Sequence, residues 1–386
     1  MNTLLRTSLS LALVVGLVGC STAPPRPPEP PSGPAAVLLP FVERHALAGA
    51  VTLVASKDKI LSHEAVGYLD LAAQTPMRPD AVFWIASQSK PITATAFMML
   101  VDEGKVSLDD PVEKYLPEFK GLMVSVEQDE NHVLLRKPAH PITIRNVLSH
   151  TSGMRFSSAM EKPTLDMLTL RDAVRSYALT PLQYEPDTKY QYSNAGINTA
   201  ARILEVVSGT AYEDFLQKRL FDPLGLKDTT FWPSPEQVAR LAKAYKPNAS
   251  KDGLEEIKIS QLTYPLPDRR RQPMPAGGLF STATDVARFC QMILAGGEFE
   301  GHRYLSEKAI HEMTTKQTPE ALKEGYGLGW STGASFGHGG ALSTNMSIDP
   351  KKGLITVWLV QHSGFPGDGQ KSQGAWMQAV RQKFDP

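Results

Sequence analysis

The stretch Phe83-Trp84-Ile85-Ala86-Ser87-Gln88-Ser89-Lys90 joins a short apolar run to the start of a predicted helix. The run from Ala81 to Ala86 is too apolar for a surface loop, and Ile92 to Val101 reads as a nearly unbroken apolar helix. Ser87 therefore lies between two elements that we expect to be buried. We expect the rest of the chain to be organised around this junction.

The junction also carries a possible nucleophile and its base. Lys90 follows Ser87 by three residues, so both side chains lie on one face of a helix. A serine hydroxyl is a weak nucleophile until a base takes its proton, and a lysine whose pKa is lowered by burial is such a base. The start of the helix adds N–H groups that favour developing negative charge. An exposed helix cap is the alternative reading of an isolated Ser-x-x-Lys.

The first residues differ from the remainder of the 386-residue chain. Arg6 and the apolar run from Leu9 to Cys20 predict a signal peptide, because the run is too short to span a membrane. Leu17-Val18-Gly19-Cys20 resembles the bacterial lipobox, in which the cysteine is lipidated. We therefore predict a lipoprotein signal peptide at 1–20, with a plain signal peptide as the alternative, and a Pro-rich tether at 21–36.

These features predict an exported bacterial lipoprotein of the cell envelope that binds the membrane through a lipid on Cys20 and faces the periplasm. Ser21 lies where an inner-membrane retention signal has Asp, which favours the outer membrane.

Charge and composition exclude several other classes. Lys plus Arg and Asp plus Glu both number 40, so nothing indicates a nucleic-acid partner. The nine histidines show no metal-ligand spacing, so we expect neither a metal nor another cofactor. Cys290 lies in a predicted amphipathic helix, and we expect a buried, inert thiol there.

Apolar and alternating runs near both ends of the chain predict strands, and helical patterns dominate between them. This order predicts an α+β fold, in which one antiparallel sheet built from both chain ends is flanked by helices and a mostly helical domain is inserted. The predicted strands cover residues 50–55, 60–65, 326–331, 343–348 and 354–360. In a domain at 37–386, the sheet part covers about 37–90 and 320–386, and the helical part about 91–319.

Smaller elements are expected between these ends. The runs 122–126 and 132–135 flank an acidic turn and predict a surface hairpin. Thr143 is expected to cap a helix that ends near Gly153, and residues 235–245 to form another helix.

Two further motifs carry polar groups of possible chemical use. Tyr190-Gln191-Tyr192-Ser193-Asn194 lies in a polar loop before a predicted helix. A positive charge such as that of Lys90 would lower the pKa of Tyr192 and make its phenolate a usable base. Asn194 could donate to a substrate carbonyl, with a helix cap as the alternative. Phe336-Gly337-His338-Gly339-Gly340 lies between predicted strands, where glycines would let a ligand approach the backbone, and a hairpin turn is the alternative.

Ser87-x-x-Lys90, Tyr192-Ser193-Asn194 and His338-Gly339-Gly340 have the order and approximate spacing of the three active-site motifs of the serine β-lactamase and penicillin-binding-protein superfamily. The chain most resembles its class C β-lactamase-like branch, which includes esterases, D-amino-acid peptidases and β-lactamases. The resemblance extends over about residues 37–384, and Ile142 to Gly153 and Ala276 to Ala283 agree with it as well.

The resemblance implies a serine hydrolase that forms an acyl-enzyme on Ser87 and acts on a small-molecule ester, a small D-amino-acid peptide or amide, or a β-lactam. Lys90 and Tyr192 would be the base system, and Tyr192 would activate the deacylating water. Asn194 would hold the substrate, and the N–H groups of Ser87 and Ala341 would form the oxyanion hole.

The third motif, which with Ala341 would line the substrate site, departs from the family pattern. His338-Gly339-Gly340 stands where β-lactamases and penicillin-binding proteins usually have Lys-Thr-Gly. An unperturbed imidazole is about half-charged near neutral pH, so His338 would hold a substrate carboxylate less firmly than a lysine. We therefore expect substrate preference to change between about pH 5.5 and 8, and esters or small peptides to be at least as good substrates as β-lactams.

Three other interpretations stay open at this point. Ser331 and Ser335 each lie in a Gly-x-Ser-x-Gly sequence, although the strand, sharp turn and helix of a nucleophile elbow are not predicted there. A non-turnover penicillin-binding or peptidoglycan-binding module on the same fold is the alternative to an enzyme, and the presence of Tyr192 favours turnover. Arg269-Arg270-Arg271 could contact anionic cell-wall polymer or be solvated surface.

Overall fold

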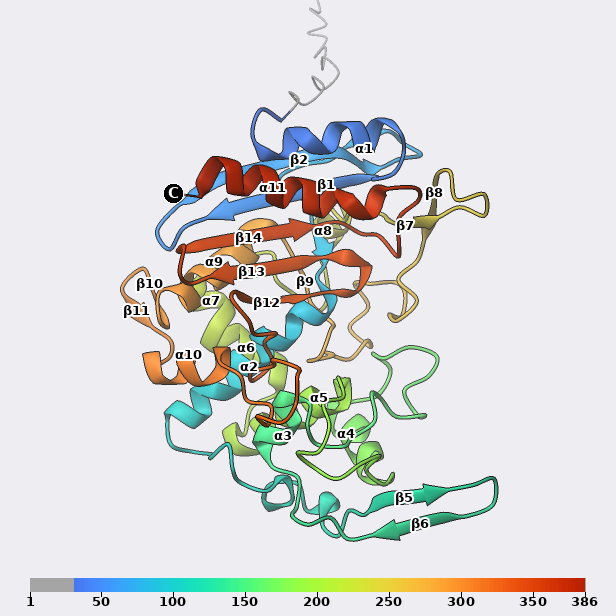
Figure 1. Cartoon of the computed structure of the whole chain (residues 1–386), viewed down its shortest axis with the longest axis vertical. Coiled ribbons are helices and arrows are strands. Elements are labelled where there is room, and N and C mark those ends of the chain that lie inside the picture. The colour runs from blue at the N-terminus through green and yellow to red at the C-terminus, as the bar shows by residue number, and fades with distance from the viewer. Residues whose placement is uncertain (1–30, 386) are drawn as a thin grey trace, which may run out of the picture.

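The computed structural model describes residues 31–385 (Figure 1). The predicted signal peptide, Cys20 and most of the predicted tether lie outside the described residues. Strands from both ends of the described part form one sheet, helices cover both of its faces, and a mostly helical part adjoins its β12 edge (Figure 1). This arrangement confirms the predicted α+β fold.

The main sheet has six antiparallel strands in the order β12-β13-β14-β1-β2-β3. Its central pair joins the two chain ends, because β1 pairs with β14 from Val51 opposite Leu359 to Ala55 opposite Ile355. The strands are β1 (Gly49–Ala55), β2 (Ile60–Asp70), β3 (Thr75–Pro76), β12 (Phe336–Gly339), β13 (Asn345–Asp349) and β14 (Leu354–Leu359). The prediction of one sheet built from both chain ends is therefore confirmed.

Both faces of β1 are buried, and its side chains divide between two hydrophobic clusters. Val51 belongs to the cluster that includes α9 (Ala283–Leu294), whereas Ala50 belongs to the cluster that includes α11 (Ser372–Phe384). Trp376 of α11 is almost fully buried there, 5.7 Å from the ring of Trp358 in β14. A strand buried on both faces reads as a continuous apolar run, which explains why β1 does not alternate.

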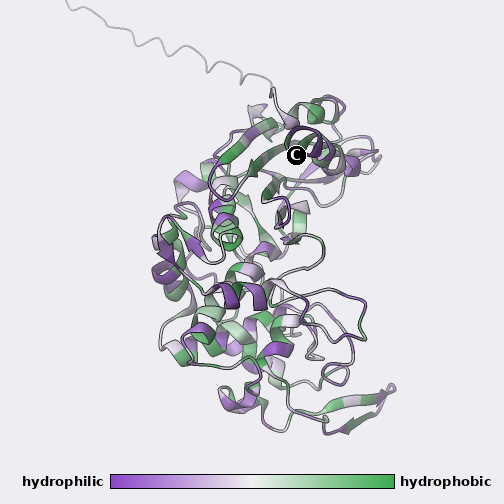
Figure 2. Ribbon diagram, turned by 60° about the vertical axis from the view of Figure 1, so that its left-hand side comes forward, coloured by the Kyte–Doolittle hydropathy of each residue, from purple (hydrophilic) through white to green (hydrophobic). Residues whose placement is uncertain are grey.

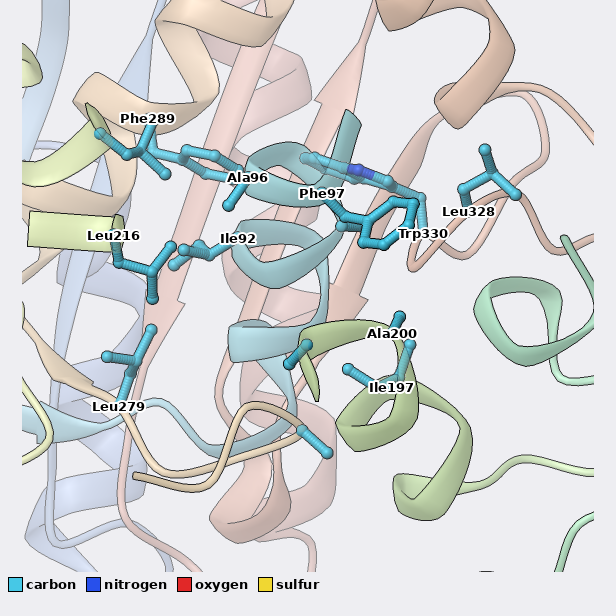
Figure 3. Packing of buried hydrophobic residues seen from close by; sticks show 14 of the residues in the cluster. Ile92, Ala96, Phe97, Ile197, Ala200, Leu216, Leu279, Phe289, Leu328 and Trp330 are labelled. Carbon is cyan, nitrogen blue, oxygen red and sulfur yellow. The ribbon is translucent and has the colours of Figure 1, made fainter. Parts of the chain in front are cut away.

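The helix α2 (Ser89–Asp102) lies between the sheet and the helical part. Every residue from Ser89 to Leu100 is buried. Figure 3 shows Phe97 and Ala96 among the side chains of one core cluster, together with Trp330 and Phe289 from distant segments. A helix that is apolar on all sides is typical of such a central position, and here it fixes the place of the residues at its N-terminus.

The remaining helices and minor strand pairs complete the two parts of the fold. The helices are α1 (Leu39–Glu43), α3 (Ile144–Ser149), α4 (Leu170–Ala178), α5 (Asn194–Ser208), α6 (Tyr212–Leu216), α7 (Asp222–Leu224), α8 (Pro235–Ala239) and α10 (Glu307–Thr314). The minor strand pairs are β4 (Phe83–Trp84) with β9 (Phe280–Ser281), β5 (Val124–Gln128) with β6 (Val133–Arg136), β7 (Ala244–Pro247) with β8 (Leu254–Ile257), and β10 (Glu298–Phe299) with β11 (His302–Arg303). Within residues 31–385, no helix has both the length and the apolar character needed to cross a bilayer.

The predicted surface hairpin is present as β5 and β6, and it projects from the helical part (Figure 2). Leu134 and Val133 are 56% and 47% exposed, although both are large apolar residues. Thr143 caps α3 as expected, with its hydroxyl accepting from the backbone N–H of Asn146.

The folded domain begins before residue 37. Residues 34–38 form a 3₁₀ turn, and the backbone N–H groups of Gly33 and Ala35 donate to the Glu64 carboxylate at 2.8 and 3.2 Å. Ala35 is fully buried. The predicted boundary between a tether at 21–36 and a domain at 37–386 therefore lies too late in the chain. The Pro-rich sequence does not reveal that its backbone bonds to Glu64 in β2.

Two predicted elements differ from those observed. The helix expected at 235–245 ends at Ala239, because the next segment bonds to other backbone: Ala242 N–H donates to Val82 O and Tyr245 N–H to Gln361 O. The strand expected at 326–331 is a tight turn in which Gly327 N–H donates to Trp330 O at 2.8 Å.

One arginine of the predicted exposed triplet is buried. Arg271 is 3% exposed, and its guanidinium lies 2.7 Å from the Asp166 carboxylate. It also donates to the carbonyls of Phe231 and Leu266 at 2.9 and 2.6 Å. Arg271 therefore joins separate loops and is not available to an anionic polymer, whereas Arg270 is exposed and pairs with Asp268.

Arg271→Ala should lower the free energy of unfolding by about 3–5 kcal/mol, because it leaves the Asp166 carboxylate buried without its partner. Arg270→Ala is the matched control, and this exposed change should alter stability by less than about 0.5 kcal/mol. Urea denaturation of both variants measures the difference. Equal stabilities of the two variants would contradict a structural role for the buried pair.

Candidate active site

Ser87 lies in a 3₁₀ turn (η2, Ala86–Gln88) between β4 and α2. The turn is held by Ser89, whose hydroxyl donates to the Ala86 carbonyl at 2.6 Å and accepts from Leu279 N–H at 3.2 Å. Ala86 has a φ of +47°, which is unusual for a residue with a side chain. Such a conformation costs about 1–3 kcal/mol and persists only where surrounding contacts enforce it.

Lys90 is fully buried and its amine has three polar neighbours. Its Nζ lies 3.2 Å from Ser87 Oγ, 2.8 Å from Asn194 Oδ1 and 2.7 Å from the Ala276 carbonyl oxygen. Loss of solvent lowers the pKa of Lys90 well below its ordinary value, which favours the neutral amine.

A neutral amine has two N–H donors and one lone pair, which matches the neighbours of Lys90. Asn194 Oδ1 and the Ala276 carbonyl are acceptors and take the two N–H groups. Ser87 Oγ is the neighbour that can also donate, so in the neutral state of Lys90 its hydroxyl proton can bond to the amine lone pair. The arrangement therefore fits a base that takes the proton of Ser87.

Tyr192 lies beside both Ser87 and Lys90, just before α5. Its ring centre is 4.5 Å from Lys90 Nζ. Burial raises the pKa of Tyr192, and its contact with the Ser87 hydroxyl offsets part of that rise. The expected lowering of this pKa by a charged Lys90 is therefore wrong for the free protein, because burial acts on both residues and disfavours both charged forms.

Asn194 is the first residue of α5, and its side chain holds Lys90 through Oδ1. Within the described chain its Nδ2 makes no hydrogen bond to protein, so it is free to donate to a substrate. The helix-cap alternative applies to Ser193 instead, whose Oγ accepts from Gly196 N–H at 3.1 Å.

His338 lies near the end of β12 and is only 7% exposed. Its Nε2 is 3.0 Å from the hydroxyl of Tyr326. Burial, together with any charge on Lys90, lowers the pKa of His338 to about 3. The expectation of a half-charged imidazole near neutral pH is therefore wrong, because the side chain has lost its solvent.

The glycines of the third motif let the backbone approach the turn that holds Ser87. A side chain at Gly340 would collide with the Ile85 carbonyl, so this position needs glycine for contact with protein and not with a ligand. At Gly339, a side chain would meet no atom closer than 3.7 Å. The close approach places Ala341, which begins the 3₁₀ turn η6 (Ala341–Ser343), next to η2.

The two backbone N–H groups predicted to form the oxyanion hole are free of protein partners. In the turn that starts at Gly340, Gly340 N–H donates to Thr344 O and Ser343 N–H donates to Gly340 O. Among residues 31–385, the N–H groups of Ala341 and Ser87 donate to no acceptor. The structure therefore brings the predicted nucleophile, base, tyrosine, amide and oxyanion donors together.

The other serines considered as nucleophiles, and the inert thiol predicted at Cys290, lie elsewhere. Ser331 and Ser335 are exposed, and no helix follows either of them as a nucleophile elbow requires. Cys290 is fully buried, burial raises its pKa, and its Sγ lies 3.7 Å from Met346 Sδ. No cluster of three or more metal-ligating side chains occurs in the part of the chain that the structure describes.

Two site residues were not predicted. His150 is 1% exposed with a φ of +63°, and its ring centre lies 4.7 Å from that of Tyr192. Tyr326 contacts both His338 and His150. The sequence shows His150 only as the end of a helix and Tyr326 only as the start of an apolar run, so neither pattern indicates a role in the site.

Comparisons with known proteins identify relatives of this chain. The esterase EstB of Burkholderia gladioli is 28% identical over 367 residues, which is 81% of this chain and 90% of that protein. The protein Rv1367c of Mycobacterium tuberculosis is 30% identical over 354 residues, covering 82% of this chain and 86% of that protein.

A solved structure shares the fold. EstCE1, described as a hydrolase with promiscuous acyltransferase activity, superposes with a TM-score of 0.74 at 24% identity, covering 90% of this chain and 97% of its own. The sequence profile of the Beta-lactamase family matches residues 35–380. The chain thus belongs to the Beta-lactamase family, within the serine β-lactamase and penicillin-binding-protein superfamily.

Proposed function

We propose that this protein hydrolyses esters through an acyl-enzyme on Ser87, with Lys90 as the base that activates it. The observation that carries the proposal is the set of three contacts of Lys90 Nζ, which orients the lone pair of a neutral amine toward Ser87 Oγ. The resemblance to an esterase supports ester substrates.

Acylation follows from the geometry. Ser87 Oγ attacks the acyl carbonyl while its proton moves to Lys90 Nζ. The developing oxyanion accepts from the N–H groups of Ser87 and Ala341, which have no acceptor within the described residues. Tyr192 gives its phenolic proton to the leaving alkoxide, and Lys90 returns a proton to the phenolate, so that an alcohol leaves and both bases end neutral.

Deacylation uses the same pair in reverse. A water proton moves to Lys90, directly or through the hydroxyl of Tyr192, as the water attacks the acyl carbon. The ammonium that forms lies 4.5 Å from the Tyr192 ring and lowers the pKa of the phenol while the charge lasts. Tyr192 therefore becomes acidic only during the reaction. The tetrahedral intermediate then collapses: the bond between the acyl carbon and Ser87 Oγ breaks, Ser87 takes the proton from Lys90, and the carboxylic acid leaves.

The surroundings of the oxyanion site favour uncharged acyl groups. Ala341 and Leu342 pack against an apolar cluster that includes Leu262, Leu266 and Met274. His338 is buried and neutral, so the third motif supplies no cation for a substrate carboxylate. A neutral ester suits these walls better than a carboxylate-bearing β-lactam.

Treatment with a fluorophosphonate should add one adduct, located on Ser87 by peptide mass spectrometry. Ser87→Ala should abolish both the adduct and hydrolysis of p-nitrophenyl butyrate, whereas Ser331→Ala, an exposed serine in a Gly-x-Ser-x-Gly sequence, should change neither. An adduct that persists on another serine in Ser87→Ala would overturn the assignment.

Lys90→Met should lower kcat by at least about 100-fold, because a positioned acid or base contributes that much or more.

Tyr192→Phe should slow deacylation and let acyl-enzyme accumulate, seen as a burst of p-nitrophenol followed by slow turnover. The wild-type kcat/KM should rise with pH through the lowered pKa of Lys90, since only the neutral amine accepts the proton. Turnover that is unchanged in Tyr192→Phe contradicts this role. A burst without turnover in the wild type would instead identify a binding module.

We also propose that the protein is an exported bacterial lipoprotein anchored through Cys20, most consistent with the outer membrane. The family match begins at residue 35, after the predicted signal peptide at 1–20 and near the end of the predicted tether at 21–36. Full-length protein should fractionate with membranes and release into detergent, whereas Cys20→Ser should not. Protein starting at residue 31 should be soluble and fully active, because it keeps the turn at 34–38. Membrane retention of Cys20→Ser would contradict lipid anchoring.

A further inference from the structure

The hydrogen bonds of His338 fit a neutral imidazole with its proton on Nδ1. Its Nδ1 lies 2.5 Å from the Gly339 carbonyl, which can only accept, so Nδ1 carries the proton. Its Nε2 then has a lone pair and accepts from the Tyr326 hydroxyl at 3.0 Å. A neutral imidazole satisfies both contacts, and a second proton on Nε2 would face the hydroxyl that now donates to it.

His150 continues this group of residues toward the second motif. Its Nδ1 accepts from the backbone N–H of Ser193 at 3.2 Å, so in the neutral ring Nε2 carries the proton. Within residues 31–385 that buried Nε2 has no partner. The His150 ring packs 4.6 Å from Tyr326 and 4.7 Å from Tyr192, measured between ring centres.

The groups that face His338 come from four segments, and none is a carboxylate. They are Lys90 of α2, Tyr192 before α5, Tyr326 of the turn before β12, and His150 after α3. Lys90, when charged, opposes a charge on His338 and on His150 alike. None of these four side chains carries a negative charge that would stabilise an imidazolium. The Gly339 carbonyl favours the charged ring, but burial outweighs it.

We propose that Tyr326 and His150 are positioning residues that hold His338 as a neutral hydrogen-bond acceptor, link the second motif to the third, and thereby select uncharged acyl groups. The link runs from Ser193 N–H through His150, Tyr326 and His338 to the carbonyl of Gly339, two residues before the oxyanion donor Ala341. This inference rests on the proposed ester hydrolysis at Ser87 and names its substrate class.

A matched substrate pair tests the selectivity. p-Nitrophenyl valerate and mono-p-nitrophenyl succinate have acyl chains of similar length, and only the second carries a carboxylate. The wild type should prefer the neutral ester, and the ratio of kcat/KM for the two substrates should stay constant between about pH 5.5 and 8, since an unperturbed histidine would titrate within that window. A ratio of kcat/KM values that changes with pH within that window, in either direction, would overturn the proposal.

Variants test the positioning role. Tyr326→Phe should lower kcat on the neutral ester about 3- to 10-fold with KM nearly unchanged, as expected for a lost buried hydrogen bond. Tyr190→Phe is the matched control, because its ring lies 5.7 Å from that of Tyr326 but forms no hydrogen bond to His150, Tyr326 or His338. Its kcat should stay within about 2-fold, the scale of a change that removes no hydrogen bond.

The conservative replacement His338→Gln keeps an acceptor near the position of Nε2 and should retain most activity on the neutral ester, whereas His338→Ala should not. Tyr326→Phe combined with His338→Ala should cost no more than the larger single change, because both remove the same bond. Additive losses, or equal losses in Tyr326→Phe and Tyr190→Phe, would refute the link. Thermal melting of each variant separates a loss of folding from a loss of positioning, and His338→Gln remains informative if Tyr326→Phe unfolds.

Fluorophosphonate labelling distinguishes the two levels of the argument. If Ser87 is not labelled in the wild type, the proposed function itself fails. If Ser87 is labelled but the substrate ratio depends on pH or the paired variants are additive, the hydrolase stands and the role of Tyr326 and His150 is wrong.

Discussion

The burial of the Lys90 amine is the constraint on which the site depends. An ammonium without solvent and without a carboxylate partner is unfavourable, and desolvation alone accounts for the lowered pKa of this residue. The protein maintains that environment by surrounding α2 with core residues on every side, so that residues 89–100 are all buried. The core packing that buries α2 therefore also sets the charge state of the proposed base.

The second requirement is a close approach between the turn that holds Ser87 and the segment that follows β12. The left-handed backbone at Ala86 begins the turn that holds Ser87 between β4 and α2, and Gly340 lets the segment after β12 approach that turn closely. Neither feature would persist alone, because the strained backbone needs the contacts with Leu279 and Ile85 that hold it. The two oxyanion donors lie near one another because the turns η2 and η6 pack together.

Much of this arrangement could be predicted from residue patterns. The apolar run before Ser87 and the apolar helix after it indicated a buried junction, and strand-like runs at both ends indicated one sheet. The predictions failed where distant partners decide the outcome. Glu64 draws Gly33 and Ala35 into the fold, and backbone bonds from Val82 and Gln361 convert the end of a predicted helix into a strand. No local pattern contains those partners.

The predictions for the site also divide into those that succeeded and those that failed. Residue types and order placed Ser87, Lys90, Tyr192 and Asn194 together, because each is chemically distinctive. The charge states were not predictable, since pKa values depend on burial by segments far away in sequence. Arg271 reads as surface charge and is buried, and His338 reads as a switch near neutral pH and is neutral.

The neutral third motif changes how the base is controlled. Where a superfamily member has a lysine in place of His338, a second cation near the base would help to keep the first lysine unprotonated. Here burial acts alone on Lys90, and the site can remain a base only while water is excluded from around its amine. An acyl group that covers Lys90 without bringing charge or water preserves this condition, whereas a carboxylate beside Lys90 would stabilise the ammonium and weaken the base. Neutral acyl groups are thus favoured both by the apolar residues around the oxyanion site and by the need to keep Lys90 uncharged.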